Sequence, residues 1–152
     1  MLAGLGTLGL EILDQCECKL EAVVVPNSDK TLLKALRHSI KSIFPHIKIM
    51  GAQVKNKELT RVRSFPDIDV SDTSDGVIQV SDADLSRTVI RVLEEKGVLL
   101  SKEGVSGLAA VMAGDLTQLT NTRVVVVLSE CLVPSLLQLE QLINEGLAAR
   151  DW

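Results

Sequence analysis

The apolar residues of this chain follow two alternating patterns. Short runs rich in Val and Ile are typical of strands in a parallel sheet, and they occur at residues 22–25, 47–50, 76–80 and 124–128. Longer segments place apolar residues at helical spacing, which predicts helices at residues 5–18, 30–43, 82–96, 104–113 and from Pro134 onward. Because strands and helices alternate, we expect an α/β fold, with a mainly parallel sheet and helices on both of its faces.

The boundaries between these elements carry their own signals. Asn27-Ser28-Asp29 is a turn and a possible helix cap. Ser81-Asp82-Ala83-Asp84 resembles a capping box that opens a helix, and Gly97 ends that helix. The small residues of segment 104–113, which ends at Gly114, would permit close packing against a sheet.

Residues 55–75 are polar and irregular, and we interpret them as a surface loop within a single domain of residues 1–152. We interpret the basic residues of this stretch as part of a solvated loop. They are Lys55, Lys57, Arg61 and Arg63.

Composition narrows the classes of function. Hydrophobic residues make up 46% of the 152 residues and aromatic residues only 2%, so a core of Leu, Val, Ile and Ala is expected. A net charge of -4 without clustered Lys and Arg, and without aromatic platforms, argues against nucleic acid as a partner. No run approaches the roughly 20 apolar residues of a membrane span. No signal peptide is recognised, and three cysteines without a disulfide framework fit a reducing compartment, so we expect a cytoplasmic protein.

Three glycines near the amino terminus match the spacing of a dinucleotide-binding fingerprint. They are Gly4, Gly6 and Gly9, and Asp29 lies about 20 residues beyond them. That fingerprint requires a strand before the glycines, and only three residues precede Gly4. We therefore interpret the glycines as a structural turn and keep a nucleotide-binding module as an alternative.

Cysteine and histidine do not indicate a metal or a nucleophile. Cys16 and Cys18 are spaced like a pair of metal ligands, but a zinc site needs about four ligands. The remaining candidates do not form a second closely spaced pair, and they are Cys131, His38 and His46. His38 is expected on the exposed side of its helix and His46 in a turn, without the arrangement of a catalytic triad.

The two acidic residues Asp82 and Asp84 could be mistaken for a metal-binding pair. Their position at the start of a helix explains both by capping. We therefore expect no metal site.

An ordered set of segments resembles the threonine dehydratases and serine racemases, which are fold type II enzymes that use pyridoxal phosphate. Residues 6–12 are similar to the family's helix start G-T-x-G-x-E-I, and residues 23–26 to a strand that ends in V-V-P. Residues 77–82 are similar to the segment I-V-x-V-S-D, and residues 124–129 to the late strand that ends in V-V-L-S-G-G. Residues 47–54 resemble the strand that follows V-V-P, and residues 97–111 follow the family's helix–strand–helix order. The resemblance implies the carboxyl-terminal half of such an enzyme, in its large cofactor-binding domain. It also implies that Ser129 contacts the pyridine nitrogen of the cofactor.

The departures from this family fall in the loops that hold the cofactor. The family carries its Schiff-base lysine in an S-x-K-x-R-like motif near the amino terminus, upstream of anything in this sequence. The family's tetraglycine phosphate loop corresponds to residues 27–31, which contain no glycine and include Asp29, although Lys30 could partly compensate. Ser101 stands near the family's Glu, Glu130 and Cys131 follow Ser129 in place of glycines, and a long piece is missing around residues 55–75.

Three hypotheses follow. The first is a degenerate or truncated relative of the serine/threonine dehydratases without catalysis of its own, which forms a homo-oligomer or pairs with another chain. The second is part of a pyridoxal-phosphate-dependent ammonia-lyase for L-serine or L-threonine that another chain completes. The third is the nucleotide-binding module.

Overall fold

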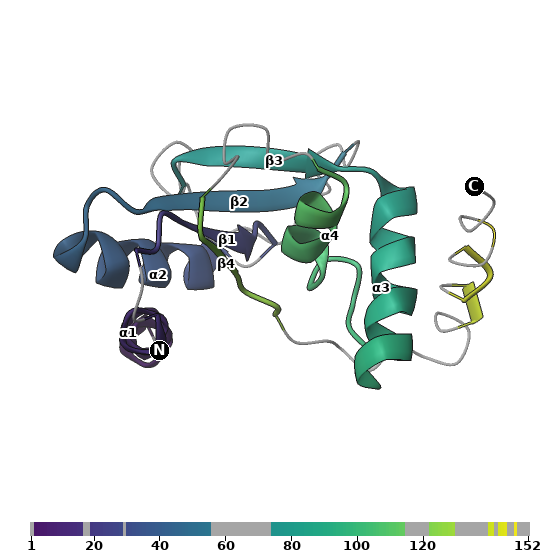
Figure 1. The fold of residues 1–152 in the computed structure, drawn as a ribbon, viewed down its shortest axis with the longest axis horizontal. Coiled ribbons are helices and arrows are strands. Elements are labelled where there is room, and N and C mark those ends of the chain that lie inside the picture. The colour runs from purple at the N-terminus through teal and green to yellow at the C-terminus, as the bar shows by residue number, and fades with distance from the viewer. Residues whose placement is uncertain are drawn as a thin grey trace.

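A computed structural model describes residues 2–16, 19–28, 30–55, 74–114, 122–129, 140–141, 143–145 and 148. Its elements run in the order α1 (Leu2–Gln15), β1 (Ala22–Pro26), α2 (Lys30–Ile43), β2 (Lys48–Val54), β3 (Gly76–Val80), α3 (Asp82–Lys96), α4 (Ser106–Met112) and β4 (Val124–Val126) (Figure 1). None of the described helices has the length and apolar character needed to cross a membrane.

The four described strands form one parallel sheet in the order β3-β2-β1-β4. Central strand β1 is buried at all five positions, as a strand covered on both faces must be. Ala22 of β1 lies opposite Lys48 of β2 on one side and Val124 of β4 on the other. The predicted α/β fold with a parallel sheet is confirmed.

Helices cover both faces of this sheet. On one face α1 and α2 pack on a core that includes Val23, Val25 and Ile49. On the other face α3 and α4 pack on a core that includes Val24 and Val80. Figure 1 shows α1 beneath α2, on the side away from the sheet, and α4 between the strands and α3. Because successive strand residues face opposite cores, the Val run of β1 serves both.

The predicted start and end of α3 are confirmed. The Ser81 side chain caps α3 by accepting a hydrogen bond of 3.2 Å from the backbone N–H of Asp84. Gly97 ends α3 with a φ of 66°, a left-handed conformation that favours glycine. Gly114, just after α4, has a φ of 75°.

The predicted glycine turn is wrong, because Gly4, Gly6 and Gly9 all lie inside α1. A Cβ built on Gly9 would lie 2.1 Å from the hydroxyl oxygen of Ser39 on α2, so this glycine permits the close crossing of the two helices. The dinucleotide fingerprint requires glycines between a strand and a helix, and their position within a helix removes the basis of the nucleotide-binding alternative.

Smaller differences concern the ends of elements. Residues 98–100 form no strand, although the family's order predicts one there. The strand expected at residues 124–128 is shorter, with β4 confined to Val124–Val126. Most of the predicted loop at residues 55–75 and the start of the helix predicted from Pro134 lie outside the described residues, whereas residues 140–141, 143–145 and 148 are helical.

Candidate functional site

The sheet has a topological switch point between β1 and β4. The chain proceeds from β1 to β2 and β3 in one direction and then returns to β4 on the other side of β1. In open parallel sheets, ligands bind outside the carboxyl ends of the strands at this point. Three segments meet here, namely the turn after β1, the residues after β4 and the start of α4.

The start of α4 packs tightly against the residues that follow β4. A Cβ built on Gly104 would lie 2.4 Å from the carbonyl oxygen of Ser129 and 3.2 Å from the hydroxyl oxygen of Ser101. The backbone N–H of Gly104 also donates a 3.0 Å hydrogen bond to Ser101 Oγ. Ser101, Gly104 and Ser129 therefore lie together, and only glycine fits between the two serines.

The next turn of the same segment approaches the sheet just as closely. A Cβ built on Gly107 would lie 3.0 Å from Val126 Cγ1 and 3.6 Å from the Val24 carbonyl oxygen. The buried Ser106 hydroxyl lies 2.7 Å from the carbonyl oxygen of Glu103 and 3.3 Å from that of Ala52. The prediction that small residues allow close packing here is confirmed.

In the turn after β1, the backbone and the side chain of Asn27 both form hydrogen bonds with residues of β2. The backbone N–H of Asn27 donates to the carbonyl oxygen of Ala52 at 2.8 Å, and its Nδ2 donates to Gln53 Oε1 at 2.8 Å. The Asn27 side chain lies over Gly51, whose added Cβ would be 3.2 Å from Asn27 Oδ1. This Oδ1 atom is buried and has no hydrogen-bond partner in the described part of the chain. Sequence reasoning missed the pair of Asn27 and Gln53, which could have been suspected from a polar residue that directly follows a buried strand.

These contacts do not fit the phosphate group of pyridoxal phosphate. A phosphate cradle needs converging backbone N–H groups that are free to bind the anion. At Asn27 the N–H is already bound to Ala52, and a side chain fills the space that a glycine would leave open. Lys30 begins α2 and is half-buried, whereas Asp29 lies outside the described residues.

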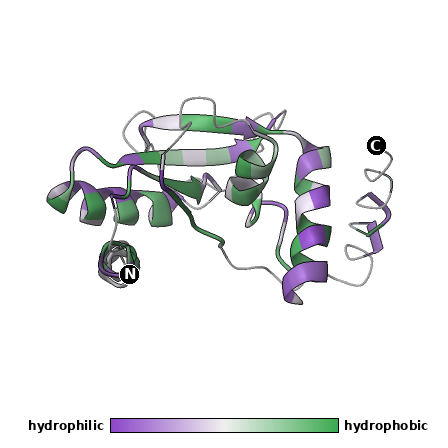
Figure 2. Ribbon diagram, in the orientation of Figure 1, coloured by the Kyte–Doolittle hydropathy of each residue, from purple (hydrophilic) through white to green (hydrophobic). Residues whose placement is uncertain are grey.

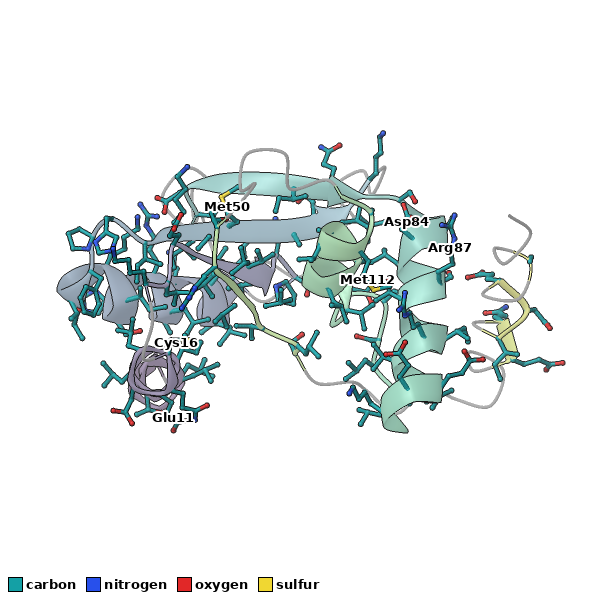
Figure 3. The ribbon with its side chains drawn as sticks, in the orientation of Figure 1. Glu11, Cys16, Met50, Asp84, Arg87 and Met112 are labelled. Carbon is teal, nitrogen blue, oxygen red and sulfur yellow. The ribbon has the colours of Figure 1, made fainter. Side chains whose placement is uncertain are left out.

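The predicted site residues are only partly brought together. Ser129 lies at the switch point, and its contact with the pyridine nitrogen stays a prediction. His38 and His46 are exposed, and the His46 ring meets Phe44 edge to face at 5.9 Å. Cys16 is partly buried on the side of α1 that faces α2, opposite the exposed Glu11 (Figure 3), whereas Cys18 and Cys131 lie outside the described residues. Within the described ranges no three His, Cys, Asp or Glu side chains gather as metal ligands.

Asp82 and Asp84 have protein partners, in agreement with a role at the helix start. Asp84 lies 3.3 Å from Arg87 on the surface of α3 (Figure 3). Asp82 forms an ion pair of 2.8 Å with Lys102, which also lies 2.5 Å from Glu145. Burial lowers the pKa of Lys102, but the hydrogen bonds and charges of Asp82 and Glu145 outweigh it and raise the pKa above its ordinary value. Sequence reasoning missed this cluster, which joins residues far apart in the chain.

A second charged cluster lies at the opposite, amino end of the sheet. Asp75 binds Arg37 at 2.6 Å, Lys41 at 2.7 Å and the backbone N–H of Ile49 at 2.8 Å. Partial burial raises the pKa of Asp75, but the hydrogen bonds of Lys41, Arg37 and Ile49 outweigh it and hold this pKa at about 2. This cluster fastens β3 and β2 to α2 and is distant from the switch point.

Known proteins resemble this chain over most of its length. The L-threonine ammonia-lyase of Thermotoga maritima is 25% identical over 172 residues, which cover 97% of this chain and 42% of that protein. The serine racemase of Arabidopsis thaliana is 30% identical over 109 residues, which cover 67% of this chain and 32% of that protein. The solved structure of threonine deaminase isoform 2 from Solanum lycopersicum has 20% identity and a TM-score of 0.73, and the match covers 97% of this chain and 47% of that one.

The chain thus spans less than half the length of these curated relatives. The likeness to the tomato structure concerns the fold alone, because the identity is low. The family described as pyridoxal-phosphate dependent enzymes matches residues 1–130, which is most of the chain. By its sequence and its fold, this chain belongs to the family of pyridoxal-phosphate dependent enzymes.

Proposed function

We propose that this chain is a degenerate relative of the serine/threonine dehydratases that does not catalyse on its own and acts as a structural or regulatory subunit. The turn after β1 carries the proposal. Its first N–H is bound to Ala52, and the Asn27 side chain lies where a cradle of bare glycine backbone would have to open. In the proposed role the chain is one cytoplasmic domain that associates with a second chain.

The contrast between packing residues and cofactor residues supports this proposal. Core strands need only apolar volume and tolerate drift in sequence, whereas a phosphate loop needs particular backbone chemistry. The Val runs of β1 and β4 keep their family pattern, while the turn after β1 has no glycine. The chain therefore carries the residues that pack the scaffold and lacks glycine in the turn after β1.

A second candidate function is part of a pyridoxal-phosphate-dependent ammonia-lyase that another chain completes. Two observations favour it. The curated relatives named ammonia-lyase and racemase are more than twice as long as the matched region. Ser129 lies at the switch point beside Gly104, where a cofactor ring would be bound.

Titration with pyridoxal phosphate distinguishes the two proposed functions. The purified chain is titrated with it, the imine absorbance is followed, and borohydride reduction is followed by mass spectrometry of the modified lysines. For a degenerate relative we expect no saturable imine, label scattered over exposed lysines, and no keto-acid release from L-serine or L-threonine.

The matched variant is Lys30→Ala, since Lys30 is the lysine that begins α2 next to the altered turn. Stoichiometric label on Lys30, abolished by this substitution, would overturn the degenerate function and favour a surviving cofactor site. Scattered label that Lys30→Ala leaves unchanged would support the proposal.

A further inference from the structure

Lys102 connects three segments that lie far apart in the sequence. Its Nζ atom lies 2.8 Å from Asp82, which begins α3, and 2.5 Å from Glu145. Glu145 belongs to a helical stretch described at residues 140–141, 143–145 and 148, which we call the Glu145 segment. Figure 1 shows this segment beside α3, on the side away from α4. One ammonium group therefore joins the loop before α4, the start of α3 and the Glu145 segment.

Glu145 also contacts a buried hydroxyl group of α3. Ser86 is 1% exposed, and its hydroxyl oxygen lies 3.3 Å from Glu145 Oε2 and 3.0 Å from the carbonyl oxygen of Asp82. Ile90, one turn further along the same side of α3, is 8% exposed, although it is not among the residues that pack on either core of the sheet. This flank of α3 is therefore covered by something other than the two cores, and Glu145 lies on it.

The backbone around Lys102 forms the turn that packs against the residues after β4. The Ser101 hydroxyl accepts a 3.0 Å hydrogen bond from the N–H of Gly104, and the Ser101 carbonyl accepts a 3.1 Å bond from the N–H of Val105. Gly104 in turn lies against the carbonyl oxygen of Ser129 at the switch point. Because Lys102 lies inside this turn, its ion pairs hold the turn as well as the Glu145 segment.

The charges of the cluster make Lys102 its necessary member. Asp82 and Glu145 contact the same nitrogen atom, so their carboxylates lie close together and would repel each other without the ammonium group. The Lys102 side chain is 19% exposed, whereas those of Asp82 and Glu145 are 61% and 51% exposed. Salt screens ion pairs whose carboxylates face water, so these contacts should weaken as the ionic strength rises.

The described part of the Glu145 segment is polar. Figure 2 shows it as largely hydrophilic, and its described residues are all exposed, including Ile143 at 37%. Charge pairing, and not the burial of apolar side chains, is the contact that these residues show with α3 and the turn.

We propose that the Glu145 segment is a strap on the flank of α3, and that the ion pair of Lys102 with Glu145 holds both this strap and the turn of residues 101–104 in place. When the ion pair breaks, the strap leaves α3 and the turn at the switch point loosens with it. The device links positions that are 43 residues apart, so a change at the strap alters the carboxyl end of the sheet. It does not depend on whether the chain binds pyridoxal phosphate, so this proposal and the proposed function fail separately.

The test is amide hydrogen exchange of the full chain, read by mass spectrometry on peptides that contain residues 101–106 or residue 145. Lys102→Met keeps most of the apolar stem and removes the charge, so both sets of peptides should exchange roughly threefold faster or more, while peptides from β1 stay unchanged. Lys102→Arg keeps the charge and should retain most of the protection. The matched control is Arg91→Met, which removes an exposed ion pair of 2.7 Å with Glu95 on α3 and should leave both sets unchanged.

Ionic strength separates an ion-pair strap from one held by apolar packing. Raising the salt concentration from about 0.05 M to about 1 M shortens the Debye length to about 3 Å, so the parent should lose protection in both sets of peptides. Lys102→Met should respond much less, because it has no charge to screen. A parent whose exchange does not change with salt, or a Lys102→Met variant that is protected like the parent, would overturn the proposal.

Glu145→Gln tests whether the strap reaches the turn. This substitution weakens the ion pair from the side of the strap, and it should speed exchange at residues 101–106 as Lys102→Met does. The double variant of Lys102→Met and Glu145→Gln should exchange no faster than Lys102→Met alone, because both changes break one contact. If Glu145→Gln left residues 101–106 as protected as in the parent, the turn would not depend on the strap and the proposal would be wrong.

Discussion

Asp75 at the amino end of the sheet and Asn27 at the carboxyl end differ in how far their polar atoms have partners. At the amino end Asp75 is satisfied by Arg37, Lys41 and a backbone N–H, which hold its pKa at about 2. At the carboxyl end the turn after β1 contains a buried Asn27 oxygen with no partner in the described part of the chain. A partnered cluster stabilises the scaffold, whereas a buried polar atom without a partner costs free energy of folding.

The difference separates the part of the chain that packs from the part where the family's cofactor loop would lie. At the amino end the contacts of Asp75 with Arg37, Lys41 and Ile49 join β3 and β2 to α2. At the carboxyl end the Asn27 side chain binds Gln53, and its Oδ1 has no partner among the described residues. The proposed loss of catalysis rests on these contacts, and stability measurements at both ends test whether the contacts form.

The largest effect is expected from Gly104→Ala at the carboxyl end. The new Cβ would lie 2.4 Å from the Ser129 carbonyl oxygen, so the segment after β4 must move away from α4. We expect the free energy of unfolding to fall by about 2 kcal/mol and Tm by roughly 4–8 °C. Thermal unfolding followed by circular dichroism measures this change.

The matched control is Gly4→Ala in α1, where an added Cβ would meet nothing within 4 Å. Alanine favours helix over glycine, so this variant should gain up to about 1 kcal/mol. If neither substitution lowered the free energy of unfolding, Gly104 would not lie as close to the Ser129 carbonyl oxygen as the structure shows.

Asp75→Asn should produce an effect that depends on pH. Since the folded pKa is depressed from 3.8 to about 2, the carboxylate stabilises the fold fully above pH 4 to 5 and loses its contribution as pH falls toward 2. The variant should unfold with about 1–2 kcal/mol less free energy at pH 7, after allowance for solvent screening of this partly exposed group. Tm measured from pH 7 to pH 2 should show the two proteins converging, while Glu95→Gln should show a smaller effect of the same kind, because the ion pair of Glu95 with Arg91 is exposed to solvent.

The smallest effects on stability are expected from substitutions of Asn27 and Gln53, whose side chains bind each other. The order of the two effects tests whether Asn27 Oδ1 lacks a partner. Gln53→Ala leaves both polar atoms of the Asn27 amide without partners, so it should cost about 1 kcal/mol. Asn27→Ala removes the unsatisfied oxygen together with the hydrogen bond, so it should cost less than Gln53→Ala. Denaturant unfolding of both variants gives this order, and the reverse order would mean that Asn27 Oδ1 has a partner.

Much of the scaffold was predictable because its signals are local. A run of Val followed by Pro, an N-terminal Ser81 cap and a Gly97 that accepts a left-handed conformation each act over a few residues. The prediction of a glycine turn is wrong because the spacing of Gly4, Gly6 and Gly9 matches a motif, whereas all three lie inside α1 and Gly9 permits the close approach to Ser39 of α2. No local pattern reveals a helix that lies 30 residues further along the chain.

The site shows the same division between local and distant causes. Ser129 could be named because the strand before it resembles the family's V-V-L-S segment, and the turn at Asn27 could be named from its polar residues. The contact of Ser129 with Gly104 and the pairing of Asn27 with Gln53 join residues about 25 positions apart, so sequence reasoning could not find them. The cluster of Lys102, Asp82 and Glu145 was missed for the same reason.

By itself the sequence determined the alternation of strands and helices, the parallel sheet, and the absence of glycine from the turn after β1, because hydrophobic period and backbone chemistry are properties of consecutive residues. Only the tertiary structure decided that β4 pairs with β1 on the side away from β2, that Gly104 lies against Ser129, and that Asp75 binds both Arg37 and Lys41. These contacts depend on the order of strands and the packing of helices, which are set by the shape of the whole core.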